Sequence, residues 1–425
     1  MSYPPEIRKA LRNITIGQCA GLLGPLLFGN GFMLAYFLRL GVPSYRILFL
    51  FALLPLINMA LTLPFAWTSD RSGKKKIGGT GLAVSIIGFF MLPLAAFTSH
   101  DALWWLTAGI LIFSVGNAAN GASWFALLSP LVPEGIRGRW FGQMRMSWQT
   151  TSILFSLGLT VLLRHNPELY IFQFLLAATG ILMIVRLAFY SQIPELEPVN
   201  PHREGFLQTA GSLLKIQDYT RFCIYGFLLA FINGVAGLFG LLEKEVLGFS
   251  DSQLIMMGNL LSIGTIAGFF IGGKIVDHFG TKPVFLAGHI GLALSLTGIL
   301  LRNFSPLAMI PTIGTILLLC GATQGAVGIA GTSELLALIP SKNKSLSTGF
   351  NMTLAAAGAS LAGFLNGHLL KIKLLPDSWI LFGKSMSAYD ILFIGFLAMT
   401  ALMAVTLGLV PTIRQIRSQW IPQNN

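Results

Sequence analysis

The chain has 425 residues, of which 54% are hydrophobic and only 10% are charged, and its mean hydropathy is +0.72. Because a soluble domain carries about 25% charged residues to cover its surface, this composition excludes a water-soluble globular protein and indicates a membrane protein. The net charge of +12 does not call for a nucleic-acid partner, since the basic residues are spread over loops rather than gathered on one soluble face.

Twelve apolar stretches of about 20 residues follow one another, each long enough to cross roughly 30 Å of hydrocarbon. Each stretch is continuously apolar, which predicts a helix, because a barrel strand would alternate lipid-facing and lumen-facing residues. We therefore expect an all-α polytopic membrane protein with twelve transmembrane helices. The predicted spans are 14–38, 45–68, 77–97, 103–128, 140–163, 168–190, 218–242, 252–275, 283–301, 307–331, 346–370 and 387–411.

The loops predict the orientation of the chain. With the N-terminus in the cytoplasm, twenty of the 28 lysines and arginines lie inside, Arg186 among them, and eight lie outside. This bias follows the positive-inside rule and predicts two cytoplasmic termini, in a plasma (inner) membrane. The first span lacks a small-residue cleavage site and is predicted to stay uncleaved. Cys19, Cys223 and Cys320 lie in spans without metal-ligand spacing, which predicts packing roles and no metal site.

The loop after the second span concentrates charge, because residues 69–76 read SDRSGKKK. Gly73 allows a tight turn, Asp70 can cap or pair at a helix end, and the basic residues hold the loop in the cytoplasm. We predict that Asp70 and Arg71 also belong to a gate that latches the protein on the cytoplasmic side. The alternative is that this loop only fixes the topology.

The fourth span carries Asn117, Asn120 and Trp124 on one helical stripe. Amides in hydrocarbon need hydrogen-bond partners, and an indole ring beside them suits a ring-bearing neutral solute such as a sugar. Hydrogen bonding between helices is the alternative for each single Asn. With polar residues of other spans they form the predicted substrate-binding set: Asn30, Asn117, Asn120, Trp124, Gln149, Asn233 and Gln324.

A polar stretch divides six spans from six and predicts three parts. These are an N-terminal six-helix bundle over 1–190, a cytoplasmic linker over 191–217 with an amphipathic helix near 204–216, and a C-terminal six-helix bundle over 218–425. The halves repeat one pattern, because five residue matches share an offset of 207 positions, which indicates a duplication with parallel topology. The matches are Asp70 with Asp277, Gly73 with Gly280, Pro133 with Pro340, Arg137 with Lys344 and Gly142 with Gly349.

Glu334 lies near the cytoplasmic end of the tenth span, where a carboxylate is costly and usually has a partner. In position it resembles a glutamate that sugar-porter transporters carry in a cytoplasmic salt-bridge network, and this resemblance implies a gate with Arg137, Arg139 or Arg145 as partners; an interfacial carboxylate in water is the alternative. Arg145 is equally suited to contact substrate or lipid headgroups. His289, inside the ninth span, is predicted to pack with one hydrogen bond rather than to relay protons.

AWTSDRSGKKK (66–76) and GGKIVDHFGTK (272–282) resemble the loop signature G-x-x-x-D-x-x-G-x-K/R of the major facilitator superfamily. PEGIRGRWFG (133–142) is similar to a further loop pattern of that superfamily, while Ala66 replaces the first glycine of the N-terminal signature. The resemblance implies a twelve-helix secondary transporter whose site lies between two bundles and is lined by helices 1, 4, 7 and 10. The predicted gating set is Asp70, Arg71, Gly73, Arg137, Arg139, Arg145, Asp277, Gly280, Lys282 and Glu334.

The chain also departs from patterns of that superfamily. NAANG (117–121) stands where many members carry R-x-x-Q-G, a setting associated with proton transfer. TTSILFSLGLTVLL (150–163) lacks the glycine-proline motif of drug/proton antiporters. Both departures count against proton-driven export of drugs.

Taken together, the residues predict a secondary active or facilitative transporter of a small organic solute that works by alternating access, with a preference for a neutral, sugar-like substrate. No nucleophile and base and no phosphate loop is recognisable, so neither an enzyme nor a cofactor is predicted. The expected partners are a small-molecule substrate, the lipid bilayer and a coupling ion, either proton or sodium, and the protein is expected to be a monomer. Two alternatives stay open: efflux of lipophilic compounds, and a non-transporting sensor or assembly factor on a transporter fold.

Overall fold

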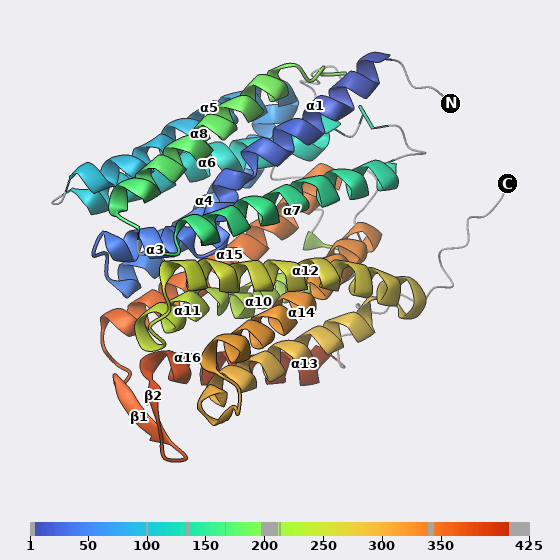
Figure 1. Ribbon diagram of the computed structural model, residues 1–425. Coiled ribbons are helices and arrows are strands. Elements are labelled where there is room, and N and C mark those ends of the chain that lie inside the picture. The colour runs from blue at the N-terminus through green and yellow to red at the C-terminus, as the bar shows by residue number, and fades with distance from the viewer. Residues whose placement is uncertain are drawn as a thin grey trace.

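A computed structural model gives the structure of the protein, which is a bundle of long helices (Figure 1). It describes residues 5–98, 101–128, 130–132, 137–165, 167–196, 211, 214–338 and 344–407. Every one of the twelve predicted spans contains at least one helix, so the all-α polytopic fold is confirmed.

The helices of the first half are α1 (Pro5–Gly21), α2 (Leu23–Gly29), α3 (Phe32–Arg39), α4 (Ser44–Ser72), α5 (Lys74–Leu94), α6 (Ala102–Leu128), α7 (Arg137–Leu162) and α8 (Leu169–Ser191). Those of the second half are α10 (Gln217–Asn233), α11 (Ala236–Leu241), α12 (Asp251–Phe279), α13 (Thr281–Leu300), α14 (Met309–Leu338), α15 (Lys344–Lys371) and α16 (Ala388–Leu407). A π-helical turn, Leu242–Val246, continues α11, and short 3-10 turns follow α5 and α13 at Ala95–Phe97 and Arg302–Phe304.

Among the described residues, nine helices are long and apolar enough to cross a membrane, or ten if the bent pair Pro5–Gly29 and Phe32–Arg39 forms one span. The other two predicted spans correspond to α7 and α15. These helices have 26 and 28 residues, which is long enough to cross a bilayer, but they carry more polar side chains than the others. The protein is therefore an integral membrane protein, and its helices are consistent with the predicted count of twelve.

The first span is broken near its middle. The chain bends by 55° between α2 and α3, where Gly31 has φ +88°, a conformation that favours glycine. Asn30 stabilises the break, because its Oδ1 accepts a hydrogen bond of 3.1 Å from the backbone N–H of Phe32. The break thus explains why the predicted span is not one continuous helix.

Small residues bring pairs of helices into close contact. A Cβ atom on Gly116 of α6 would lie 2.3 Å from the carbonyl oxygen of Gly81 on α5, and one on Gly268 of α12 would lie 2.0 Å from that of Ala322 on α14. Such contacts between backbones are typical of helices packed in a membrane. The hydrophobic effect does not drive helices together there, and small residues let the backbones approach closely enough for van der Waals packing to do so.

A two-stranded antiparallel hairpin, β1 (Ser378–Leu381) and β2 (Lys384–Ser387), connects α15 to α16. The sequence interpretation did not predict it. The hairpin lies at the end of the molecule where α3, α11 and the start of α16 also lie (Figure 1). We call this end the hairpin end, and the end where α1 begins and α4 passes into α5 the opposite end.

The two halves contact each other through α4 with α15 and through α7 with α12. The hydroxyl of Ser360 on α15 donates a hydrogen bond of 3.2 Å to the backbone carbonyl of Ala52 on α4. The hydroxyl of Ser252 on α12 donates one of 2.7 Å to the backbone carbonyl of Thr160 on α7. Residues 197–210, 212 and 213 of the predicted linker 191–217, and with them most of its predicted helix, lie outside the described residues. The division into two bundles and a linker therefore stays a prediction.

Candidate functional site

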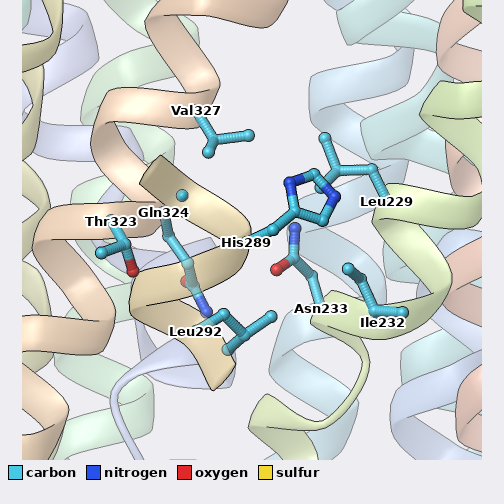
Figure 2. A pocket seen from close by; sticks show the side chains of 9 residues that line it. Leu229, Ile232, Asn233, His289, Leu292, Thr323, Gln324 and Val327 are labelled. Carbon is cyan, nitrogen blue, oxygen red and sulfur yellow. The ribbon is translucent and has the colours of Figure 1, made fainter. Parts of the chain in front are cut away.

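A small pocket lies inside the second half between α10, α13 and α14 (Figure 2). Asn233 and Gln324, two residues of the predicted substrate-binding set, line it together with His289. Figure 2 shows the side chains of Asn233 and His289 lying next to each other. The space suits about one water molecule, so in this conformation it is too small for an organic solute.

His289 has a defined tautomer when it is neutral. Its Nδ1 lies 2.6 Å from the carbonyl oxygen of Phe285, and because a carbonyl only accepts hydrogen bonds, Nδ1 carries the hydrogen. Its Nε2 is buried and has no hydrogen-bond partner among the described residues. The single hydrogen bond agrees with the packing role predicted for this residue, and the free Nε2 adds an acceptor to the pocket wall.

A second pocket lies inside the first half, between α1, α6 and α8. Its polar wall is formed by Asn13, Gln18, Trp124, Arg186 and Tyr190. The Arg186 guanidinium lies 6.0 Å from the centre of the Trp124 ring, which is in turn stacked on Tyr190 at 6.2 Å. Gln18 Oε1 and the Tyr190 hydroxyl are buried without hydrogen-bond partners among the described residues.

The first α-helix is shaped to receive Arg186. A Cβ atom on Gly21 would lie 1.9 Å from Cδ of Arg186, so only glycine leaves room for this side chain. The sequence interpretation counted Arg186 with the basic residues of the cytoplasmic side and gave it no further role, whereas the structure buries it within α8, where only 6% of its surface is exposed. A position close to a helix end cannot distinguish a residue in water from one that turns into the bundle.

Asn120 joins three helices. It donates from Nδ2 to the carbonyl of Gly78 on α5 at 3.3 Å and accepts at Oδ1 from Nη2 of Arg186 on α8 at 2.9 Å. Hydrogen bonding between helices, which was the alternative to substrate binding for this residue, is therefore present.

The hairpin end carries a network of charges that joins the two halves. Asp251, which is fully buried at the start of α12, accepts from Arg39 of α3 at 2.7 Å and also pairs with Lys244. Close by, Glu245 accepts hydrogen bonds from the hydroxyls of Ser44 on α4 and Tyr389 on α16. Sequence interpretation missed this network, although acidic residues just outside two spans were a signal for it.

The comparison with known proteins decides the family. The family profile described as Major Facilitator Superfamily matches residues 19–363. The chain belongs to this superfamily of membrane transporters. No curated protein sequence matches it.

Solved structures of superfamily transporters share the fold of the whole chain. A bacterial homologue of the iron transporter ferroportin, in an inward-facing state, has a TM-score of 0.73 at 11% identity, with 96% of this chain and 99% of that chain covered. The nucleoside transporter NupG has a TM-score of 0.68 at 14% identity, covering 96% and 99%. The human organic anion transporter MFSD10 (TETRAN) has a TM-score of 0.66 at 15% identity, covering 95% and 100%. At these identities the likeness concerns the fold.

The superfamily signature in the first half forms the turn between α4 and α5. Gly73 has φ +100°, and the residue after it starts α5. Glu195, beyond the end of α8, accepts hydrogen bonds from the backbone N–H of Lys74 at 2.6 Å and of Lys75 at 3.3 Å. Glu195 was not in the predicted set; its signal was an acidic residue directly after the sixth span.

Asp70 and Arg71 of this signature, which were predicted to form a gate, lie at the surface or near it. Asp70 is half-buried, and the guanidinium of the exposed Arg71 lies 3.8 Å from the centre of the Trp67 ring. Arg145 is exposed on α7, whereas the side chains of Arg137 and Arg139 lie outside the described residues.

In the second copy of the signature, Thr281 is hydrogen-bonded to Glu334. Thr281, the first residue of α13, donates from its hydroxyl to Oε2 of Glu334 at 2.6 Å. Glu334 is 1% exposed, so the alternative of an interfacial carboxylate in water is wrong. Gly280, with φ +82°, makes the turn before α13, while Asp277 is exposed and Lys282 is half-buried.

The rest of the predicted substrate-binding set is spread over the first half. Asn30 donates from Nδ2 to the Ser156 hydroxyl at 2.9 Å, in addition to stabilising the break before α3. Asn117 and Gln149 are half-buried and make no hydrogen bond with the described residues. The seven predicted residues therefore do not form one cluster in this conformation: Asn233 and Gln324 share one pocket, and Trp124 lines the other.

Proposed function

We propose that this protein carries a small polar organic solute across the membrane by alternating access, and that the structure is the state closed at the hairpin end. Its membership of a transporter superfamily supports transport. The observation that carries the choice of state is the ion pair between Arg39 and the fully buried Asp251, which joins the two halves at that end.

Further contacts support closure of the hairpin end. The Nδ2 atom of Asn259 on α12 donates to the hydroxyl of Thr160 on α7 at 3.1 Å, and a Cβ atom on Gly258 would lie 2.6 Å from the carbonyl oxygen of Asn30. The ribbons of α7 and α12 separate toward the opposite end (Figure 1). With the cytoplasmic termini predicted from the basic residues, the closed end faces outward and the state is inward-facing.

In this proposal the bundles 1–190 and 218–425 rock about the contacts of α4 with α15 and α7 with α12, with the linker 191–217 between them. The signature residues at the opposite end, Asp70 and Asp277 among them, form the second gate when the hairpin end opens. Such rocking about a site between repeats is the general mechanism of two-bundle carriers. The coupling ion, proton or sodium, stays a prediction, as does the monomeric state.

The substrate class is the finer part of the proposal. Amides such as Asn117, Asn233 and Gln324 offer both donors and acceptors, and this favours a solute with hydroxyl or amide groups, including the predicted sugar-like class. A lipophilic solute that covered these half-buried amides would leave them without hydrogen-bond partners, which is costly, so efflux of lipophilic compounds is the less favoured function.

Flux through proteoliposomes tests transport and the gate together. The protein, with Cys19→Ser to remove a half-buried thiol, is assayed with labelled glucose, uridine, lactate and alanine. Ser44→Cys and Glu245→Cys are then combined and joined by a short bifunctional thiol reagent. We expect at least one solute to move and the cross-link to abolish its flux, because the hairpin end can no longer open. Each single cysteine variant, treated with the same reagent, controls for modification alone. Full flux through the cross-linked protein, or no flux of any solute, would contradict the proposal.

A further inference from the structure

Arg186 is a buried cation without a buried counter-charge. Only 6% of its surface is exposed, and the one hydrogen bond that its guanidinium makes with the described residues is to Asn120. The ion pairs found among the described residues do not include it: they join Arg39 and Lys244 to Asp251, Arg221 to Asp218, and Arg302 to Asp390. Arg186 therefore differs from Arg302, the other fully enclosed arginine of the described chain.

This arrangement is costly unless something else compensates the charge. Transferring an unpaired cation out of water costs several kcal/mol even after the surroundings relax, and charged groups inside membrane spans are usually paired or functional. A guanidinium has five N–H donors, and Asn120 accepts from one of its nitrogens. The neutral amides and hydroxyl of the pocket wall supply no negative charge.

The wall beside Arg186 is built for a polar group. Gln18 Oε1 and the Tyr190 hydroxyl are buried without partners among the described residues, and both residues line the same space. The glycines of α1 leave room for the arginine side chain rather than filling the space themselves, since a Cβ on Gly21 would meet Cδ at 1.9 Å. The pocket also lies near the end of α8, toward the end of the molecule that the proposed function leaves open.

We propose that Arg186 binds an anionic group, of the size of a carboxylate, on the transported solute. This rests on the proposed function and narrows its substrate class from neutral sugar-like solutes to organic acids. The planar guanidinium forms two parallel hydrogen bonds to a carboxylate, and the ring of Trp124 packs against the body of the solute. Because the space suits about one water in this conformation, the half-buried Trp124 side chain turns aside as the acid enters.

Thermal unfolding of the purified protein in neutral detergent, with pairs of solutes that differ only in charge, tests this site. Glucuronate is compared with glucose and lactate with lactamide, at constant NaCl and ionic strength. A ligand that binds only the folded protein raises its apparent unfolding temperature. We expect at least one acid to raise it in a saturable way while its neutral counterpart does not. Equal shifts within both pairs, or no shift with either acid, would overturn the proposal.

Variants assign the effect to Arg186. Arg186→Met removes the charge at similar volume and should abolish the acid-specific shift, whereas Arg164→Met, which removes an exposed cation of the same half outside the predicted binding and gating sets, should preserve it. If Arg186→Met does not fold, Arg186→Lys keeps the charge but loses the two-pronged geometry, and we expect the acid to bind at least about tenfold more weakly. An unchanged affinity in the Arg186 variant that folds would overturn the assignment.

A third arm separates a solute from a lipid headgroup as the source of the anion. A short-chain phosphatidylglycerol is compared with a short-chain phosphatidylcholine; a shift with the former, and none with any soluble acid, would assign the site to lipid and overturn the proposal. Flux distinguishes this proposal from the function itself. If a neutral solute is transported but no acid-specific shift is seen, the anion-site proposal is refuted and the proposed transport function stands. If an acid-specific shift is seen but no solute is transported, the anion site stands and the transport function is refuted.

Discussion

The buried ion pair of Asp390 and Arg302 shows how this chain tolerates charged side chains in an apolar environment. Asp390 at the start of α16 is paired with Arg302, and its Oδ2 also accepts from the Ser387 backbone N–H at 2.7 Å and hydroxyl at 2.9 Å. Both ionic side chains are almost fully buried, with exposures of 1% and 0%. A pair with this many hydrogen bonds offsets its desolvation cost, but neither member is tolerated alone.

Asp390→Asn should therefore destabilise the protein by about 3–5 kcal/mol, because it leaves a buried arginine without its counter-charge. The measurement is unfolding in a denaturing detergent series, followed by circular dichroism. Asp218→Asn is the control, since it breaks an exposed ion pair with Arg221 whose side chains are 51% and 59% exposed, and we expect little change. Equal effects of the two substitutions would contradict the argument.

Glu195 leads to a second prediction at this scale. Its carboxylate accepts two backbone N–H groups at the start of α5, so Glu195→Ala should cost about 1 kcal/mol of stability. Glu168→Ala is the control, because Glu168 directly precedes α8 but its side chain makes no capping hydrogen bond to that helix. The same unfolding assay compares them, and a larger loss for Glu168→Ala would refute the capping role.

At the scale of elements, glycines in α12 decide how closely helices approach. Gly264 and Gly268 place the backbone of α12 against that of α14, with Cβ positions 2.1 and 2.0 Å from carbonyl oxygens of Leu318 and Ala322. Backbone atoms cannot move aside as a flexible side chain does. Even a methyl group must therefore push the two helices apart.

We expect Gly268→Ala to lower stability by about 1–3 kcal/mol, the usual cost of overpacking a well-filled interior. Gly273→Ala, five positions further along α12, is the control, because a Cβ there meets nothing within 4 Å. It should be neutral or slightly stabilising, since alanine favours the helix. Heat inactivation of the purified variants would show the difference, and loss of stability in the control alone would exclude the packing explanation.

At the scale of the whole molecule, the charge network at the hairpin end sets the balance between states. Asp251→Asn removes the anion that holds Arg39 and Lys244 together across the two halves. A shift of about 1.4 kcal/mol changes a two-state equilibrium tenfold. We expect the population open at the hairpin end to rise by at least about tenfold.

Spin labels at the exposed Arg46 and Val246, one in each half, would report this opening as a longer distance in pulsed electron resonance. Asp377→Asn removes an exposed carboxylate next to the hairpin and serves as the control, for which the distance distribution should not change. If Asp251→Asn leaves the distribution unchanged as well, the network is not a gate.

Much of the candidate site could not be predicted from the residues. Asn120 and Trp124 were recognised as unusual in an apolar span, and the structure does place them beside a pocket. Their neighbour Arg186 was missed, because its position near a helix end is equally compatible with water. Arg145 was one of three arginines predicted as alternative partners of Glu334. In this structure Glu334 bonds to Thr281 and Arg145 is exposed, because packing sets the rotation of each helix, while the side chains of Arg137 and Arg139 lie outside the described residues.

By itself the sequence determined the membrane-embedded class, the order of the helices and most of their ends to within a few residues, although α1 begins nine residues before the first predicted span and α14 ends seven residues after the tenth. Bilayer thickness fixes how long an apolar stretch must be, and that length is read along one dimension. The tertiary structure alone decided which polar groups meet, such as Arg39 with Asp251 across 212 positions and Arg186 with Asn120 across 66. Those meetings depend on how helices rotate and cross, and this is decided by close contacts of small residues, such as Gly21, with side chains far away in the sequence.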